Sequence, residues 1–153
     1  MGKFVQNIGR VNHVVIVVHA ENLESAVKSF SELLDIEMEG PFDSKEGGMT
    51  VYIDLAAGIE IVAPYNREIA TRHFEHLEKH GEGLMTVAFG VADRDAAVAR
   101  AEKLGFEVWR WAQGFAVNPA WAERFEVFDE AALSPMLHGT RLKFAEVVPK
   151  KDA

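Results

Sequence analysis

The chain repeats one order of strand and helix twice, and this repeat restricts the possible folds more than any other feature. A short, β-branched apolar run at 11–18 is followed at 20–35 by apolar residues at helical spacing. The same order returns at 84–91 and 93–105. Because one such unit cannot bury the apolar face of its own sheet, the repeat describes the whole fold.

Each copy then continues with three extended segments separated by turn residues. The segments are 36–39, 49–55 and 59–62 in the first copy, and 106–111, 125–128 and 140–148 in the second. This order predicts an α+β protein of two tandem β-α-β-β-β modules, 8–66 and 83–149, within a single domain 1–153. A helix within the linker 67–82 joins the modules, and Asn22 and Asp93 are the expected caps of the two module helices.

Composition excludes several classes of function. A length of 153 residues with 48% hydrophobic side chains is enough for a sizeable core. The net charge of −8 argues against nucleic-acid binding and against an anionic membrane surface. The absence of cysteine excludes disulfides, thiolate metal sites and a cysteine nucleophile. No apolar run suggests a signal peptide or a spanning helix, so a soluble, cytoplasmic protein is expected.

Two residues carry the chemistry expected of the first module. His13 lies near the start of its first strand, and Glu60 lies between Ile59 and Ile61 in its last strand. A lone carboxylate is costly to bury, so Glu60 needs a partner: Lys143, His13 or a metal ion. The plainer interpretation of His13 is a core histidine bonded to a backbone carbonyl.

Three short segments carry a family resemblance: Asn12-His13-Val14-Val15-Ile16, residues 58–64, and His80-Gly81-Glu82-Gly83-Leu84. They resemble methylmalonyl-CoA epimerase-like members of the vicinal oxygen chelate superfamily. That superfamily also contains glyoxalase I, extradiol dioxygenases and the bleomycin and fosfomycin resistance proteins. The resemblance covers nearly the whole chain except 112–132. It implies a glyoxalase-like fold, a half-open barrel around a central cleft, and a homodimer.

The resemblance also implies a divalent metal held by the first and last strands of each module. His13 and Glu60 are sound ligands in the first module. In the second, Thr86 stands where a histidine is expected and Lys143 where a carboxylate is expected. A one-residue bulge or a slip in the strand could present Glu146 in place of Lys143, although Glu146 lies on the opposite face by strand parity. A charged ammonium has no lone pair for a cation. We therefore expect no cofactor, or a weakly bound divalent ion, with Lys143 as a positive charge in its place.

Two functions follow from the resemblance. In the first, an enzyme of isomerase, epimerase or lyase type acts on a small carbonyl or acyl-thioester substrate. Glu60 is then the general base beside a carbonyl, and Lys143 or His13 stabilises the enolate oxygen. In the second, a metal-free protein binds a small molecule and sequesters it without reaction. Fold analogy does not separate these functions.

Further residues are candidates for substrate binding, and most of them are aromatic. The aromatic members suit a pocket for a flat or apolar ligand, but ordinary packing or a dimer interface explains them equally well. The candidates are Thr86, Trp109, Trp111, Phe115, Trp121 and His138.

Overall fold

The computed structural model describes residues 4–110 and 114–151. The chain divides into two compact units. Unit 1 contains His13–Met85, and unit 2 contains Phe4–Asn12 together with the chain from Thr86 onward. Among the described residues, no helix combines the length and the apolar character that crossing a bilayer requires.

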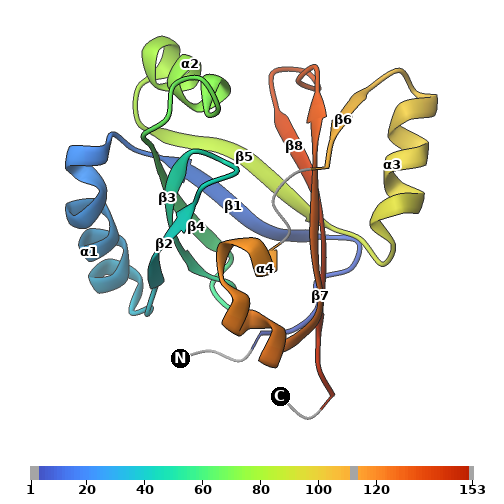
Figure 1. Cartoon of the computed structure of the whole chain (residues 1–153), viewed down its shortest axis with the longest axis horizontal. Coiled ribbons are helices and arrows are strands. Elements are labelled where there is room, and N and C mark those ends of the chain that lie inside the picture. The colour runs from blue at the N-terminus through green and yellow to red at the C-terminus, as the bar shows by residue number, and fades with distance from the viewer. Residues whose placement is uncertain (1–3, 111–113, 152–153) are drawn as a thin grey trace. The chain divides into compact units, whose positions relative to one another are not determined.

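Unit 1 forms a four-stranded sheet and two α-helices. Its elements are β1 (Val11–Val17), the short 3-10 helix η1 (Ala20–Asn22), α1 (Leu23–Leu34), β2 (Glu39–Ser44), β3 (Met49–Asp54), β4 (Ile59–Pro64) and α2 (Thr71–His80) (Figure 1). The strand order is β2-β3-β4-β1, and β1 runs parallel to β4 while the other pairs are antiparallel.

Helix α1 covers one face of this sheet. Its apolar side packs against a buried cluster that includes Tyr52, Ile61 and Ala63. Burial of an isoleucine side chain such as that of Ile61 stabilises a fold by about 1.5–3 kcal/mol. We call the sheet face opposite α1 the distal face of unit 1. It carries His13, Val15, Val51, Ile53, Glu60 and Val62, as the strand registers place them.

Unit 2 repeats the connectivity of unit 1. Its elements are β5 (Gly83–Gly90), α3 (Arg94–Lys103), β6 (Glu107–Trp109), α4 (Gly114–Val117), the 3-10 helix η2 (Pro119–Glu123), β7 (Phe125–Ser134) and β8 (Arg141–Pro149). The strand order is β5-β8-β7-β6, with β5 parallel to β8. The first strand of each unit therefore lies beside its last strand, which confirms the repeat.

Helix α3 packs on one face of the unit 2 sheet. The carboxylate of Glu146 accepts a hydrogen bond from the backbone N–H of Arg94, at the start of α3, at 2.8 Å. Ala97, Val98 and Ala101 of α3 are buried. We call the opposite face the distal face of unit 2. By register it carries Thr86, Ala88, Glu130, Ala132, Arg141, Lys143 and Ala145.

Two strand predictions were wrong in their bounds. The segment 36–39 was expected to be extended and to stop at Gly40, but β2 runs from Glu39 to Ser44. A register shift between Glu39 and Phe42 lets Pro41 sit at this sheet edge. The strand expected at 125–128 continues to Ser134, so residues 125–132 of the aromatic-rich stretch 112–132 belong to β7.

The two helix caps differ from each other. Asp93 caps α3 as predicted, because its side chain accepts a hydrogen bond from the backbone N–H of Ala96 at 2.9 Å. Asn22 does not cap α1. Its side-chain amide donates instead to Glu82 at 3.0 Å, and the backbone N–H of His19 donates to the same carboxylate oxygen at 2.7 Å. Glu82 thus ties the segment after α2 to the start of α1.

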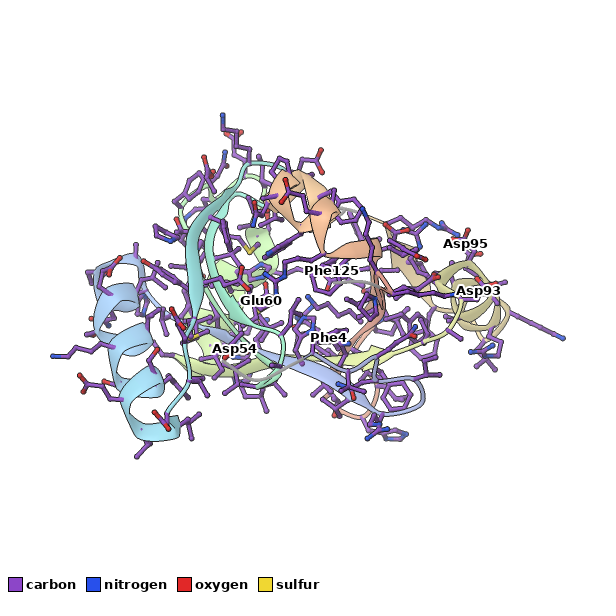
Figure 2. All side chains as sticks on the ribbon, turned by 90° about the horizontal axis from the view of Figure 1, so that it is seen from below. Phe4, Asp54, Glu60, Asp93, Asp95 and Phe125 are labelled. Atoms are coloured by element: carbon purple, nitrogen blue, oxygen red, sulfur yellow. The ribbon has the colours of Figure 1, made fainter. Side chains whose placement is uncertain are left out.

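The N-terminal segment belongs to unit 2 because it bonds to the end of β5. The N–H of Gly9 donates to the carbonyl of Gly90, and the N–H of Gly90 donates to the carbonyl of Arg10. The ring of Phe4 packs edge-on against Phe125, with centroids 5.6 Å apart; both residues are labelled in Figure 2. A Cβ at residue 90 would lie 1.5 Å from a backbone oxygen, so this contact requires glycine.

We expect Gly90→Ala to destabilise the protein by about 3 kcal/mol, because the new methyl group meets backbone that cannot move aside cheaply. Urea unfolding measures the loss. Gly139→Ala is the matched control, since a Cβ there meets nothing within 4 Å and only its φ of +78° is unfavourable. The control should lose about 1 kcal/mol. Equal losses in the two variants would contradict the close approach at Gly90.

The pKa of Glu82 is lowered first by the hydrogen bond from the Asn22 amide and then by the one from the His19 backbone. We expect Glu82→Gln to reduce stability near neutral pH by less than about 1 kcal/mol, because solvent screens exposed groups. Since the folded-state pKa is below the ordinary 4.5, the contribution is present above that value.

The contribution of Glu82 should disappear as the pH falls through the folded-state pKa. Unfolding of both proteins by urea, from about pH 7 to about pH 3, tests this. The difference between wild type and variant should shrink toward zero in acid. A stability difference that grows in acid would contradict the lowered pKa of Glu82.

Candidate functional site

The parallel pairing of β1 with β4 brings His13 and Glu60 to one face of the sheet. Glu60 is the register partner of Val15, and His13 lies two residues before Val15 on the same face. Ile61 points to the other face and belongs to the core beneath α1. Ile59 and Ile61 therefore pack beneath α1, while Glu60 between them points to the distal face of unit 1.

His13 is the partner that the carboxylate of Glu60 requires. The His13 Nε2 atom lies 3.0 Å from Glu60 Oε2. The imidazole is fully buried, whereas 13% of the Glu60 side chain is exposed. Apolar neighbours on this face, among them Val15 and Ile53, lower the local dielectric and strengthen the interaction. Solvent therefore reaches the carboxylate but not the imidazole.

The corresponding strands of unit 2 pair in the same register. Lys143 is the partner of Ala88, as Glu60 is of Val15. Thr86 precedes Ala88 by two residues, as His13 precedes Val15. Thr86 and Lys143 therefore occupy the positions in unit 2 that His13 and Glu60 occupy in unit 1.

Lys143 forms a partly buried ion pair with Glu130. The Nζ atom lies 3.1 Å and 3.2 Å from the two carboxylate oxygens, and 11% of Lys143 and 17% of Glu130 are exposed. Glu130 on β7 is the diagonal neighbour of Lys143 on β8. The register partner of Lys143 is Ala132, and that of Glu130 is Ala145. Sequence analysis missed Glu130. Residues 128–134 do not alternate strictly between apolar and polar side chains, so they carry no clear sign of the face on which Glu130 lies.

Sequence analysis also missed Arg141, and it left Glu146 as an alternative to Lys143. Arg141 is the register partner of the buried Thr86 on the distal face of unit 2. The carboxylate of Glu146 binds at the start of α3 and so lies on the opposite face from Lys143. Glu146 lies three residues after Lys143 on β8, and residues an odd number apart on a strand point to opposite faces.

The predicted aromatic candidates have different surroundings. Trp109 on β6 is 52% exposed, whereas Trp121 is 2% exposed and stacks on Phe128 with ring centroids 5.0 Å apart. The structure thus places Trp121 in the packing of η2 against β7. Phe115 lies half-buried in α4. Trp111 lies outside the described residues.

His138 is exposed at the tip of the β7–β8 hairpin. Its φ is +47° and that of Gly139 is +78°, while Leu137 and Thr140 exchange two backbone hydrogen bonds of 2.9 Å. Two consecutive positive φ angles are the requirement of a tight hairpin turn. The turn therefore accounts for the position of His138.

The metal site implied by the family resemblance does not fit both units. Unit 1 offers an imidazole nitrogen and a carboxylate oxygen, which are good ligands. The equivalent positions of unit 2 hold a neutral hydroxyl and an ammonium, and that ammonium binds the nearby carboxylate of Glu130. The family's four-residue set is therefore incomplete, and we assign no chemical step to a metal.

Comparisons with solved structures show the same fold in other proteins. A methylmalonyl-CoA epimerase from Streptomyces coelicolor, in complex with 2-nitronate-propionyl-CoA, is 21% identical with a TM-score of 0.66, over 91% of this chain and 97% of that one. The Mycobacterium tuberculosis methylmalonyl-CoA epimerase is 19% identical with a TM-score of 0.68, over 96% and 93%. A hypothetical protein from Bacillus halodurans is 17% identical with a TM-score of 0.66, over 90% and 93%.

No curated protein sequence matches this chain. A family model described as the Glyoxalase/Bleomycin resistance protein/Dioxygenase superfamily matches residues 12–120, which run from β1 to the start of η2 and end before β7 and β8. The repeated connectivity, the common register and this match lead to the same conclusion. The chain belongs to the glyoxalase/bleomycin resistance protein/dioxygenase superfamily.

Proposed function

We propose that this protein is an enzyme of isomerase, epimerase or lyase type that moves a proton at a carbon beside a carbonyl group. The proposed substrate is a small carbonyl compound or an acyl thioester. Glu60 is the general base that removes the proton, and the electron pair passes to the carbonyl oxygen as an enolate forms. The observation that carries the proposal is the contact between the partly exposed Glu60 carboxylate and the buried His13 imidazole.

The burial of the two side chains suggests a division of roles between them. Glu60 is the member of the pair that a substrate can touch, so it is the catalytic residue. His13 is fully buried and acts through Glu60, holding the carboxylate in one orientation. His13 is therefore a positioning residue in this proposal.

An enolate oxygen needs a hydrogen-bond donor or a positive charge to stabilise it. We assign this role to Lys143, which occupies in unit 2 the position equivalent to Glu60. An ammonium ion can supply positive charge where other enzymes use a metal. By family resemblance we also expect a homodimer.

A second candidate function is binding without reaction. It is favoured by one observation: the two proposed reacting groups already have partners, Glu60 with His13 and Lys143 with Glu130. Such pairs can hold polar groups of a ligand without transferring a proton. A protein of this kind would raise its melting temperature with ligand and show no turnover.

Exchange of substrate hydrogen for deuterium tests the enzyme proposal. The neighbouring epimerases suggest methylmalonyl-CoA and propionyl-CoA as probes. In deuterated water, wild type should exchange the α-hydrogen of at least one probe, followed by proton NMR. We expect Glu60→Gln to slow the exchange at least about 100-fold, because an amide cannot accept the proton.

The exposed Glu75 of α2 offers a matched control, since Glu75→Gln makes the same change away from the distal face. The control should exchange at the wild-type rate. Exchange that survives unchanged in Glu60→Gln would overturn the assignment of the base. No exchange by wild type with either probe, together with a ligand-dependent rise in melting temperature, would favour the binding function instead.

Metal content gives a separate prediction. Purified wild type should carry less than about one divalent ion per chain, because two good ligands in one unit hold such an ion weakly. Elemental analysis after dialysis against metal-free buffer measures this. One tightly bound ion per chain that is lost in His13→Ala would contradict the prediction.

A further inference from the structure

We propose that helix α2 binds a divalent transition-metal ion, Ni²⁺, Cu²⁺ or Zn²⁺, through the imidazoles of His76 and His80. This site goes beyond the function proposed above, because that function uses side chains of the two sheets and no residue of α2. The ion is held at the end of the helix and takes no part in the proton transfer.

The two histidines are four residues apart on α2, the green helix of Figure 1. Residues at this spacing are neighbours on one side of a helix, with Cβ atoms about 5–6 Å apart. The ring centroids of His76 and His80 lie 4.9 Å apart, and the ring planes are tilted by 48°. The two imidazoles therefore already lie side by side.

The separation of the rings matches that of two imidazoles on one ion. Metal–nitrogen bonds of about 2.0–2.1 Å and nitrogen–metal–nitrogen angles of roughly 90–109° place the two centroids about 4.5–5.2 Å apart. The observed 4.9 Å lies within this range. An imidazole binds a metal through one ring nitrogen, so the other nitrogen of each ring can keep a hydrogen bond to another group.

The residues between the histidines distinguish this site from that of a zinc protease. The run His76-Leu77-Glu78-Lys79-His80 has the histidine spacing of the H-E-x-x-H motif, but leucine stands where the motif has its catalytic glutamate. Leu77 is buried, and the carboxylate of Glu78 binds the guanidinium of Arg67 at 2.6 Å. The pair is therefore suited to holding a metal ion rather than to hydrolysis.

The ligand type selects the class of metal. Neutral imidazole suits Ni²⁺, Cu²⁺ and Zn²⁺, whereas Mg²⁺ and Ca²⁺ prefer oxygen ligands. His80 is exposed and His76 is half-buried, so water can complete the coordination. Two protein ligands hold an ion weakly, and dialysis against metal-free buffer removes it. The site is therefore compatible with the low metal content expected of the purified protein.

A metal bridge at this position stabilises the end of α2 and the segment that follows it. The N–H of Gly81 donates to the carbonyl of Leu77 at 2.9 Å, and the next residue, Glu82, accepts hydrogen bonds from Asn22 and His19. An ion that binds only the folded helix shifts the unfolding equilibrium by mass action. Metal binding should therefore raise the midpoint temperature of unfolding.

Titration calorimetry with nickel chloride, in a buffer that does not bind metals, tests the site. The starting protein is Glu60→Gln, which removes the other carboxylate–imidazole pair, in unit 1. This protein should bind Ni²⁺. Adding His80→Gln or His76→Gln should weaken the binding at least about tenfold, because a single imidazole cannot chelate the ion. Ni²⁺ should raise the unfolding midpoint of the starting protein and leave that of the His80→Gln variant unchanged.

His138→Gln, in the same starting protein, is the matched control, because His138 is an exposed histidine on the β7–β8 hairpin. The control should bind Ni²⁺ as the starting protein does. Circular dichroism checks that each variant keeps its helices. No binding by the starting protein, or equal losses in His80→Gln and His138→Gln, would overturn the site. An affinity that survives both His76→Gln and His80→Gln would overturn it as well.

Discussion

The parallel pairing of the first strand of each unit with its last strand determines what the rest of the molecule can do. In unit 1 this pairing sets Val15 beside Glu60, and in unit 2 it sets Ala88 beside Lys143. Side chains alternate across a strand, so a shift of one residue would move every functional group under a helix. The apolar residues beneath α1 and α3 hold the register, because a slip would expose them.

The same positions carry opposite chemistry in the two units. In unit 1 a carboxylate is held by an imidazole, and in unit 2 an ammonium is held by a carboxylate. The first pair is suited to accepting a proton, and the second to stabilising negative charge. This difference explains why the ligand set expected from the family is incomplete. It also supports a reaction, or a binding event, that uses fixed side-chain charge.

The sequence was sufficient to predict the repeat, the order of the elements and the face on which the chemistry lies. Ile59 and Ile61 around Glu60, and Leu142 and Phe144 around Lys143, were the signal, because apolar residues on both sides of a polar one indicate opposite faces. Patterns of this kind do not predict which residues far apart in the sequence bond to each other. Glu82 bonds to Asn22 across 60 residues, and nothing local indicates it.

Other misses have a similar cause. The pairing of Glu130 with Lys143 depends on the β7–β8 register, which is set by the tight turn at Leu137–Thr140. Without the full length of β7 that register could not be predicted. Trp121 carried the same sequence signal as Trp109, yet one is buried and the other exposed. Aromatic content alone does not separate a core residue from a surface one.

The central claim is that Thr86 and Lys143 are the structural equivalents of His13 and Glu60. The most direct test is the affinity of the double variant Thr86→His/Lys143→Glu for Zn²⁺, measured by titration calorimetry beside wild type. The account predicts at least about tenfold tighter binding, because the variant gives unit 2 a histidine and a carboxylate at neighbouring positions and releases Glu130 as a further ligand. An affinity equal to that of wild type, in a folded variant, would contradict the equivalence.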